Sequence, residues 1–211
     1  MLPLHVLQGR PGSLGQRALS STAAVARRNP SEEINESAAV PDSLTHISPE
    51  TGRPSMVDIT TKSPTSRSAT ATGRVLIPER ACIALTSSPD GRSSAKGDVL
   101  SVAQLAGLMG AKRTSDLIPL CHPLSLTNVD VRLELCADAA SNKRWIQVVA
   151  KAECKGATGV EMEALTAVSV ACLTVWDMLK AVGGKDMVIE GVMVTSKSGG
   201  KSGDWTREVE Q

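Results

Sequence analysis

The stretch Thr127-Asn128-Val129-Asp130-Val131-Arg132-Leu133-Glu134-Leu135 places an aliphatic side chain at every second position and a polar one between each pair. This period of two is typical of a strand that has one face on a core and the other in water. Residues 145–154 continue in the same way, and the polar run 138–143 between them predicts a hairpin loop. The hairpin indicates an antiparallel sheet.

Further helices and strands are predicted on both sides of this hairpin. Pro78 ends a short apolar run and can begin a helix, and Asp98 stands where the next helix needs an N-cap. The expected segments outside the hairpin are a strand at 74–77, helices at 78–85, 99–110 and 161–182, and a strand at 188–197. The order of strands and long helices is that of the split βαβ plan. We therefore expect an α+β, ferredoxin-like domain with an antiparallel sheet and two helices on one face.

The composition of the 211-residue chain excludes several classes of protein. There is no Phe or Tyr and there are three Trp, so the core must be built from Leu, Val, Ile, Ala and Met. The shortage of aromatic residues argues against stacking platforms for single-stranded nucleic acid, and a net charge of +1 argues against a basic nucleic-acid face. No unbroken apolar run reaches the ~18 residues of a membrane span. We therefore expect a soluble protein that binds neither nucleic acid nor membrane.

The five cysteines form no CxxC pair, and three histidines are too few to complete a zinc site of the usual spacing. The pattern predicts no metal site and no cofactor. Unpaired cysteines fit a reducing compartment. Four of them are expected to act as small buried apolar side chains, namely Cys82, Cys136, Cys154 and Cys172.

The N-terminal part of the chain differs from the rest. Residues 1–31 carry four Arg and no acidic residue, which is typical of a mitochondrial transit segment and predicts the mitochondrial matrix; an ordinary basic tail is the alternative. Residues 32–73 are rich in Ser, Pro and Thr and are interpreted as a mostly disordered linker with a short extended piece at 56–60. The catalytic domain is then expected at 74–205, followed by a tail at 206–211.

Two pairs of charged residues on the long predicted helix are candidates for chemistry. Glu161 and Glu163 flank Met162 at its start, where they either only favour the helix dipole or contact a ligand held by the Gly-containing turn before them. Asp177 and Lys180 form either a surface ion pair of little energetic value or an acid–base pair. Because Glu163 and Asp177 are ~21 Å apart on a straight helix, a shared site would require a long substrate or two subunits.

Two further segments carry reactive or cationic side chains. Cys121 and His122 precede a proline, which suits either a histidine that hydrogen-bonds a ligand or an ordinary loop histidine. Lys197 and Lys201 lie in a Gly/Ser-rich run that fails the P-loop pattern but can form a cationic cradle for phosphates, the alternative being a solvated tail. Lys96 precedes a helix N-terminus, where a cation gains nothing from the dipole, so ligand contact is the favoured interpretation.

Together, several segments closely resemble the MoaC-type cyclic pyranopterin monophosphate synthases of molybdenum cofactor biosynthesis. The similarity covers about residues 55–205 in unbroken order. The matching segments are KGDV (96–99), AKRTSDLIPLCHPL (111–124), GVEMEALTA (159–167), DMLKAV (177–182), KDMVI (185–189) and KSGGKSGD (197–204).

The resemblance implies an activity, an assembly and a partner. The family is a lyase that converts 3′,8-cyclo-7,8-dihydroguanosine 5′-triphosphate, made by a radical SAM GTP 3′,8-cyclase, into cyclic pyranopterin monophosphate and pyrophosphate. It implies a ferredoxin-like fold and a homohexamer assembled from dimers, with active sites at a subunit interface. A functional link to the cyclase follows from the shared intermediate.

The resemblance also implies roles for the candidate residues. It assigns Asp177, Lys180 and Lys96 to catalysis. It assigns substrate contacts to Leu120, Cys121, His122, Glu161, Met162, Glu163, Lys197 and Lys201. Two other interpretations of the sequence remain open. They are a non-catalytic nucleotide-binding regulatory module on the same fold, which would need the phosphate-binding lysines alone, and a structural interaction protein whose polar groups are only ion pairs.

Overall fold

The computed structural model describes residues 44–208, apart from 88–92, 95–96, 139 and 202. The predicted transit segment at 1–31 and the first part of the predicted linker, together with Lys96, lie outside the described residues. The side chains of residues 93, 94 and 97 are also outside that description.

An antiparallel sheet with the strand order β4-β5-β1-β6-β7 forms one layer of the domain. Its strands are β1 (Thr65–Leu76), β4 (Leu126–Asp138), β5 (Lys143–Gly156), β6 (Val188–Ser198) and β7 (Trp205–Thr206). The two hairpin strands pair side by side, so that Leu135 lies opposite Ile146. A separate short ladder joins β2 (Ser93–Ser94) to β3 (Gly97–Asp98). The hairpin is the one expected from the alternating sequence.

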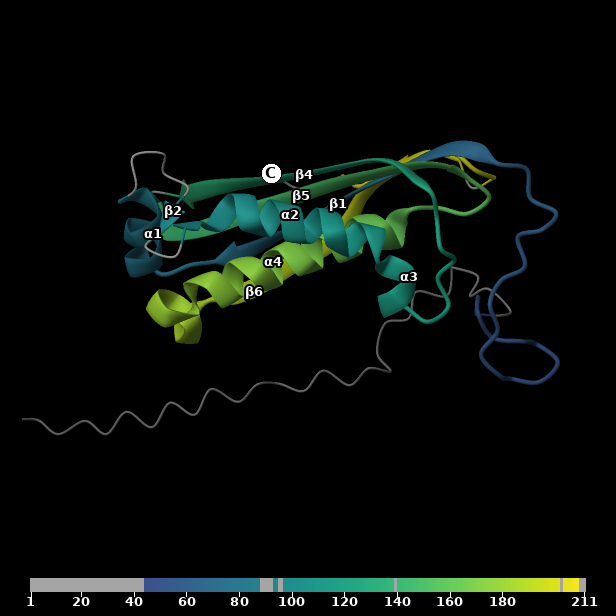
Figure 1. Ribbon diagram of the computed structural model, residues 1–211, viewed down its shortest axis with the longest axis horizontal. Helices are drawn as coiled ribbons and strands as arrows, with labels where there is room; N and C mark the ends of the chain where they lie inside the picture. The colour runs from purple at the N-terminus through teal and green to yellow at the C-terminus, as the bar shows by residue number, and fades with distance from the viewer. Residues whose placement is uncertain (1–43, 88–92, 95–96, 139, 202, 209–211) are drawn as a thin grey trace, which may run out of the picture. The chain divides into compact units, whose positions relative to one another are not determined.

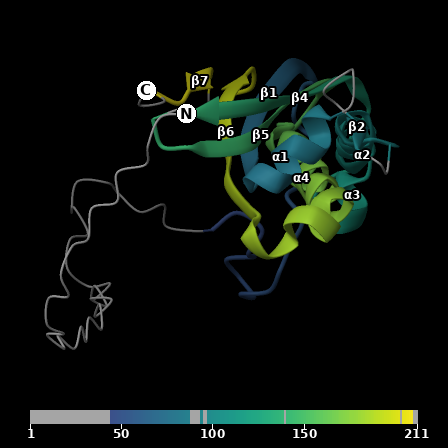
Figure 2. The same ribbon diagram turned by 90° about the vertical axis from the view of Figure 1, so that its left-hand side faces the viewer.

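The helices lie on one side of this sheet, as Figure 2 shows. They are α1 (Glu79–Thr86), α2 (Val99–Lys112), α3 (Thr114–Leu117) and α4 (Glu161–Gly183), which runs into a 3₁₀ turn, η1 (Gly184–Asp186). The long helices α2 and α4 pack against each other and against the sheet. The Asp98 carboxylate accepts a hydrogen bond of 2.9 Å from the Ser101 N–H and is the expected N-cap of α2. The α+β, ferredoxin-like prediction is therefore confirmed.

The core between sheet and helices is aliphatic. The inner face of the hairpin buries Val131 from β4, and from β5 it buries Ile146, Val148, Ala150, Ala152 and Cys154. Cys154 and Cys172 are buried as predicted. The same prediction is wrong for Cys82 and Cys136, which are only half-buried. Cys82 packs against the core with part of its surface open, and Cys136 follows the core-facing Leu135 on β4 and therefore lies on the other face of the strand.

Strand β1 begins at Thr65 rather than at Arg74, so the predicted start of this strand is wrong. The Ser, Thr, Ala and Gly residues before Arg74 were interpreted as mobile because they offer little apolar surface. In the structure, this part of the strand lies so close to α4 that only small side chains fit. Ala69 and Ala71 are buried under the helices, and a Cβ on Gly73 would lie 2.7 Å from Val168 Cγ1 of α4. The strand is held by backbone pairing on both sides.

Helix α4 has the length and the apolar composition of a membrane-spanning helix, with a mean hydropathy of 1.5. One side of it, including Ala164, Val168, Val175 and Leu179, is buried within the domain. This packing against β1, β5 and β6 accounts for its apolar character as that of a core helix.

Gly107 sets the distance between α2 and α4, and its replacement tests that packing. A Cβ at this position would lie 2.8 Å from the carbonyl oxygen of Ala167 and 3.2 Å from Ala171 Cβ. Alanine is favoured over glycine inside a helix by about 1 kcal/mol, yet here overpacking costs about 1–3 kcal/mol. We therefore expect Gly107→Ala to lower the melting temperature, as measured by circular dichroism. An increase would show that the two helices separate without cost.

Candidate active site

A cavity of about 540 Å³ lies where the start of β1, the end of β6 and the N-terminus of α4 meet. Its lining includes Lys62, Arg67, His122, Glu161 and Lys197. A second cavity of about 710 Å³ shares Lys62 and Arg67 with the first and extends to Lys201. Four cations therefore line this hollow of two adjoining cavities, namely Lys62, Arg67, Lys197 and Lys201. This is the arrangement expected for a polyanionic ligand.

A narrow cleft of about 130 Å³ shares His122 and Glu161 with the first cavity. It brings together six of the residues predicted to contact substrate, namely Leu120, Cys121, His122, Glu161, Met162 and Glu163. The segment before β4 supplies the first three, and the first turn of α4 supplies the others. The sequence prediction that these two segments share a site agrees with the structure.

Glu163 is the most buried charged group of this cleft, with 4% of its surface exposed. Burial raises the pKa of its carboxyl above the ordinary value of 4.5, and the neighbouring charge of Glu161 raises it further, against a lowering by a backbone hydrogen bond. Glu161 is paired instead with Lys197, whose Nζ lies 3.3 Å from its Oε1. A buried carboxyl with a raised pKa holds its proton more readily than an exposed one, which makes Glu163 a candidate for proton transfer as well as a favourable charge at the helix start.

We expect Glu163→Gln to stabilise the protein at high pH. A raised pKa means that the folded state binds the proton more tightly than the unfolded chain. Glu163 therefore contributes stability below its unfolded pKa, and this stability is lost as the pH rises through the folded pKa. The neutral glutamine avoids that loss, and a gain of about 1 kcal/mol would raise the melting temperature by about 2–4 °C.

Melting temperatures at about pH 8 and about pH 4 test this expectation, because the difference between variant and wild type should shrink at the lower pH. Glu161→Gln is the matched control. It removes a carboxylate that is paired with Lys197, and it should give no stabilisation at the higher pH. Equal behaviour of the two variants would contradict the assignment of the buried acid.

Cys121 also lies in the narrow cleft, where burial raises the pKa of its thiol and the charge of Glu163 raises it further. The thiol is therefore held in its neutral form, which is a poor nucleophile. Its place beside His122 suits contact with a ligand rather than covalent catalysis.

The cationic run after β6 is shaped by glycines. Gly199 and Gly200 have φ values of +85° and +82°, which favour glycine, and a Cβ on Gly200 would collide with the guanidinium of Arg67. The Gly199 N–H donates to Asp204 Oδ1 at 2.9 Å. This turn places Lys197 and Lys201 beside the cavities, so the cradle interpretation agrees with the geometry better than that of a solvated tail.

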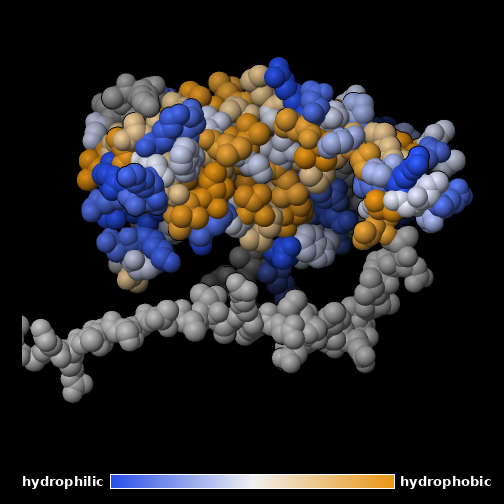
Figure 3. Space-filling view, turned by 90° about the horizontal axis from the view of Figure 1, so that it is seen from below, coloured by the Kyte–Doolittle hydropathy of each residue, from blue (hydrophilic) through white to orange (hydrophobic). Residues whose placement is uncertain are grey.

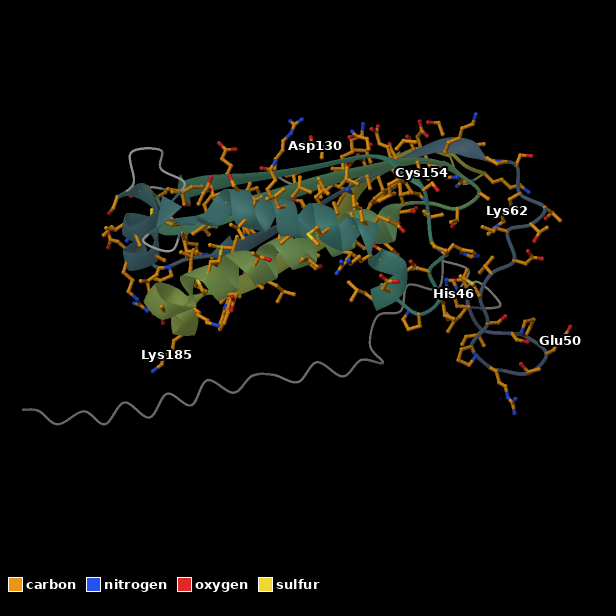
Figure 4. The ribbon with its side chains drawn as sticks, in the orientation of Figure 1. His46, Glu50, Lys62, Asp130, Cys154 and Lys185 are labelled. Atoms are coloured by element: carbon orange, nitrogen blue, oxygen red, sulfur yellow. The ribbon has the colours of Figure 1, made fainter. Side chains whose placement is uncertain are left out.

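Three site residues were missed in the sequence, namely His46, Lys62 and Arg67. All three lie in the part of the chain that was interpreted as linker. Arg67 is held by hydrogen bonds from Nε to the Gly156 carbonyl at 2.9 Å and from Nη2 to the Ala157 carbonyl at 3.2 Å. Figure 4 shows His46 and Lys62 at the same end of the domain. The one sequence feature that could have revealed these residues is that they are basic residues inside a Ser/Thr-rich run.

Asp177 and Lys180 are not brought to this hollow within one chain. Their side chains form an ion pair of 2.6 Å on α4, with 69% and 53% of their surfaces exposed. Figure 1 shows α4 running away from the end of the domain that carries the cavities, and the ~21 Å rise from Glu163 to Asp177 follows from helix geometry. Among the residues that the structure describes, no three His, Cys, Asp or Glu side chains come together as metal ligands.

Comparison with known proteins provides the remaining observation. Residues 56–200 match the MoaC family. The chain belongs to the MoaC family. It is 52% identical over 166 residues to a protein of Streptomyces coelicolor named cyclic pyranopterin monophosphate synthase, covering 79% of this chain and 91% of that protein. A protein of the same name from Brucella ovis is 53% identical over 163 residues, covering 77% of this chain and 92% of the relative.

The MoaC match contains almost all of the predicted site. It includes both segments of the narrow cleft, strand β6 with the turn after it up to Gly200, and the Asp177–Lys180 pair. Lys201 follows directly after it, and His46 lies before it. The residues of the site and the residues that match the family thus lie in almost the same part of the chain.

Proposed function

We propose that this MoaC protein is a lyase that converts 3′,8-cyclo-7,8-dihydroguanosine 5′-triphosphate into cyclic pyranopterin monophosphate and pyrophosphate in molybdenum cofactor biosynthesis. The observation that carries the proposal is the joining of a cation-lined hollow to a narrow cleft with a buried carboxyl. A triphosphate and a purine-derived ring are the two parts that such a site would hold. Relatives that bear the corresponding name match this chain over most of their length.

The two parts of the site would have different roles in the reaction. Lys62, Arg67, Lys197 and Lys201 would bind the triphosphate and stabilise the charge that develops on the departing pyrophosphate. A substrate hydroxyl attacks the α-phosphorus, the bond to the β-phosphate bridging oxygen breaks, and the hydroxyl proton is transferred to a base, which leaves a cyclic phosphate. Opening and rebuilding of the ring require further proton transfers, for which Glu163 and His122, which line the cleft, are candidates.

Asp177 and Lys180 would complete this site from a second subunit. Their distance from the cleft within one chain agrees with the expected subunit-interface site. Lys96, whose placement the structure does not describe, is proposed as a third catalytic residue on the family resemblance alone.

The proposed assembly is a homohexamer built from dimers. Large apolar side chains are exposed along α2, at Val102, Leu105 and Met109, and on α4 at Leu173. Figure 3 shows hydrophobic residues gathered in the middle of one face of the molecule. Such surfaces favour association. Multi-angle light scattering should give a particle of six 22.0 kDa chains; a monomer would contradict both the assembly and the shared site.

Two further proposals concern the cellular setting. The substrate would be supplied by a radical SAM GTP 3′,8-cyclase, as the functional partner of this protein. The Arg-rich, acid-free composition of residues 1–31 supports import into the mitochondrial matrix.

The proposed function is tested by incubating the full-length protein with freshly prepared substrate and measuring released pyrophosphate. We expect multiple turnovers. Substrate binding without pyrophosphate release would instead support the non-catalytic nucleotide-binding module, and an absence of binding would support the structural interaction protein.

A further inference from the structure

His46 has an unusual backbone conformation at the entrance to the site. Its φ of +68° lies in the left-handed region, which non-glycine residues rarely adopt and which tends to occur at functional sites. Nδ1 of its imidazole is shielded from solvent and has no hydrogen-bond partner among the described residues. A buried polar atom without a partner is costly, so both features point to a role outside the fold itself.

The backbone around His46 is held firmly in this conformation. Ile47 pairs with Pro54 in an antiparallel bridge, and the Ser48 N–H donates to the Arg53 carbonyl at 2.9 Å. The carbonyl of His46 itself accepts a bond of 2.8 Å from the Ser55 N–H. This hairpin fixes the backbone from which the imidazole projects without using any atom of that side chain.

The imidazole lies at the junction between the two parts of the site. His46 lines the 540 Å³ cavity with Arg67 and Lys197, and it also lines the narrow cleft with His122 and Glu163. A group bound across this junction would lie beside the imidazole, whose Nδ1 donates or accepts a hydrogen bond according to its tautomer. Figure 4 shows His46 near the body of the domain, whereas Glu50 of the same hairpin lies further out.

We propose that His46 is an additional substrate-binding residue whose Nδ1 hydrogen-bonds the ribose-derived part of the substrate, which links the purine-derived ring to the triphosphate. The Ile47–Pro54 hairpin is then a support that carries this group to the site. The inference rests on the proposed function, and it assigns to the segment before the family match a direct part in substrate recognition.

Three replacements of His46 separate a role in binding from a role in folding. His46→Gly removes the imidazole but adopts positive φ freely, so we expect an unchanged or higher melting temperature together with a fall in kcat/KM of about ten- to a hundredfold. His46→Asn places an amide near the position of Nδ1, tolerates positive φ, and should retain most of the activity. His46→Gln, whose amide corresponds to Nε2, should not. Glu50→Ala at the exposed hairpin tip is the control and should behave like the wild type.

Substrate dissociation constants, measured by isothermal calorimetry on each variant, complete the test. The inference predicts weaker binding in the Gly and Gln variants and near-normal binding in the Asn variant. It is overturned if His46→Gly binds and turns over substrate like the wild type, if Gln rescues better than Asn, or if activity falls only in step with the melting temperature. A wild type that binds the substrate without turnover would refute the proposed function alone, since the affinities would still compare the variants. A wild type that does not bind it would refute both.

Discussion

Lys180→Ala is expected to lower kcat by about 10²- to 10⁴-fold, which is the usual contribution of a general acid or base, while leaving the fold intact. The side chain is 53% exposed and its one described ion pair is with Asp177, so its loss should cost less than about 1 kcal/mol of stability. Asp177→Asn should have a similar effect on kcat. Steady-state turnover and thermal melting of the two variants check this expectation. Near-wild-type turnover in either variant would remove that residue from the catalytic group.

Mixed oligomers provide a sharper form of this test. If Glu163 and Lys180 reach one active site from two subunits, co-expression of Glu163→Gln with Lys180→Ala chains creates some sites that are intact. Random pairing in a two-fold symmetric dimer would restore about a quarter of the wild-type activity. Mixing Asp177→Asn with Lys180→Ala is the matched control, since both defects lie on the same helix of one subunit, and it should restore nothing. Failure of the first mixture would place the whole site within one chain.

Arg67→Met should cause the second largest loss, about a hundredfold or more in kcat/KM, because this side chain contributes both to the charge of the cavities and to the structure of a loop. Its charge lines both cavities. Its guanidinium also bridges the carbonyls of Gly156 and Ala157, which fixes the loop before α4. Removal of the guanidinium leaves these two carbonyls without this partner, which lowers the free energy of unfolding by about 1–3 kcal/mol. Turnover kinetics and thermal melting measure the two effects separately.

Two companion variants separate these two contributions. Arg67→Lys keeps the charge but loses the planar fork that reaches two carbonyls, so it should recover part of the substrate affinity and little of the stability. Arg74→Met removes an arginine from the same strand that pairs with Glu190 on the exposed side of the sheet. This control should change turnover less than about twofold, in keeping with the small value of exposed ion pairs. An equal loss in Arg74→Met would show that the effect is not specific to the site.

The parts of the fold that the sequence predicted are those with a clear period. Val129, Val131 and Leu133 alternate with polar residues, and backbone geometry converts that alternation directly into a two-faced strand. Helices α2 and α4 could be predicted for the same reason, because their apolar residues recur with the period of a helix. The start of β1 could not be predicted, because Ala69, Ala71 and Gly73 are selected by the closeness of α4, which is a property of the assembled fold.

The site was predictable to a similar extent. Residues with distinctive neighbours, such as His122 and Glu163, were found, but their meeting in one cleft required the tertiary structure. The sequence could not distinguish a dipole-favouring Glu163 from a buried one, since both begin a helix. Arg67 and His46 lie in a polar stretch without periodicity, and only the strand pairing of β1 and the hairpin at Ile47–Pro54 bring them to the hollow.

The most direct test of this account measures pyrophosphate and the fluorescent oxidised pterin in one reaction of the full-length protein with 3′,8-cyclo-7,8-dihydroguanosine 5′-triphosphate. The account predicts that the two products appear together in equal amounts, and that neither appears with Lys180→Ala. Pyrophosphate without pterin would show simple hydrolysis of the triphosphate, and neither product from the wild type would show binding alone; either result would contradict the proposed lyase.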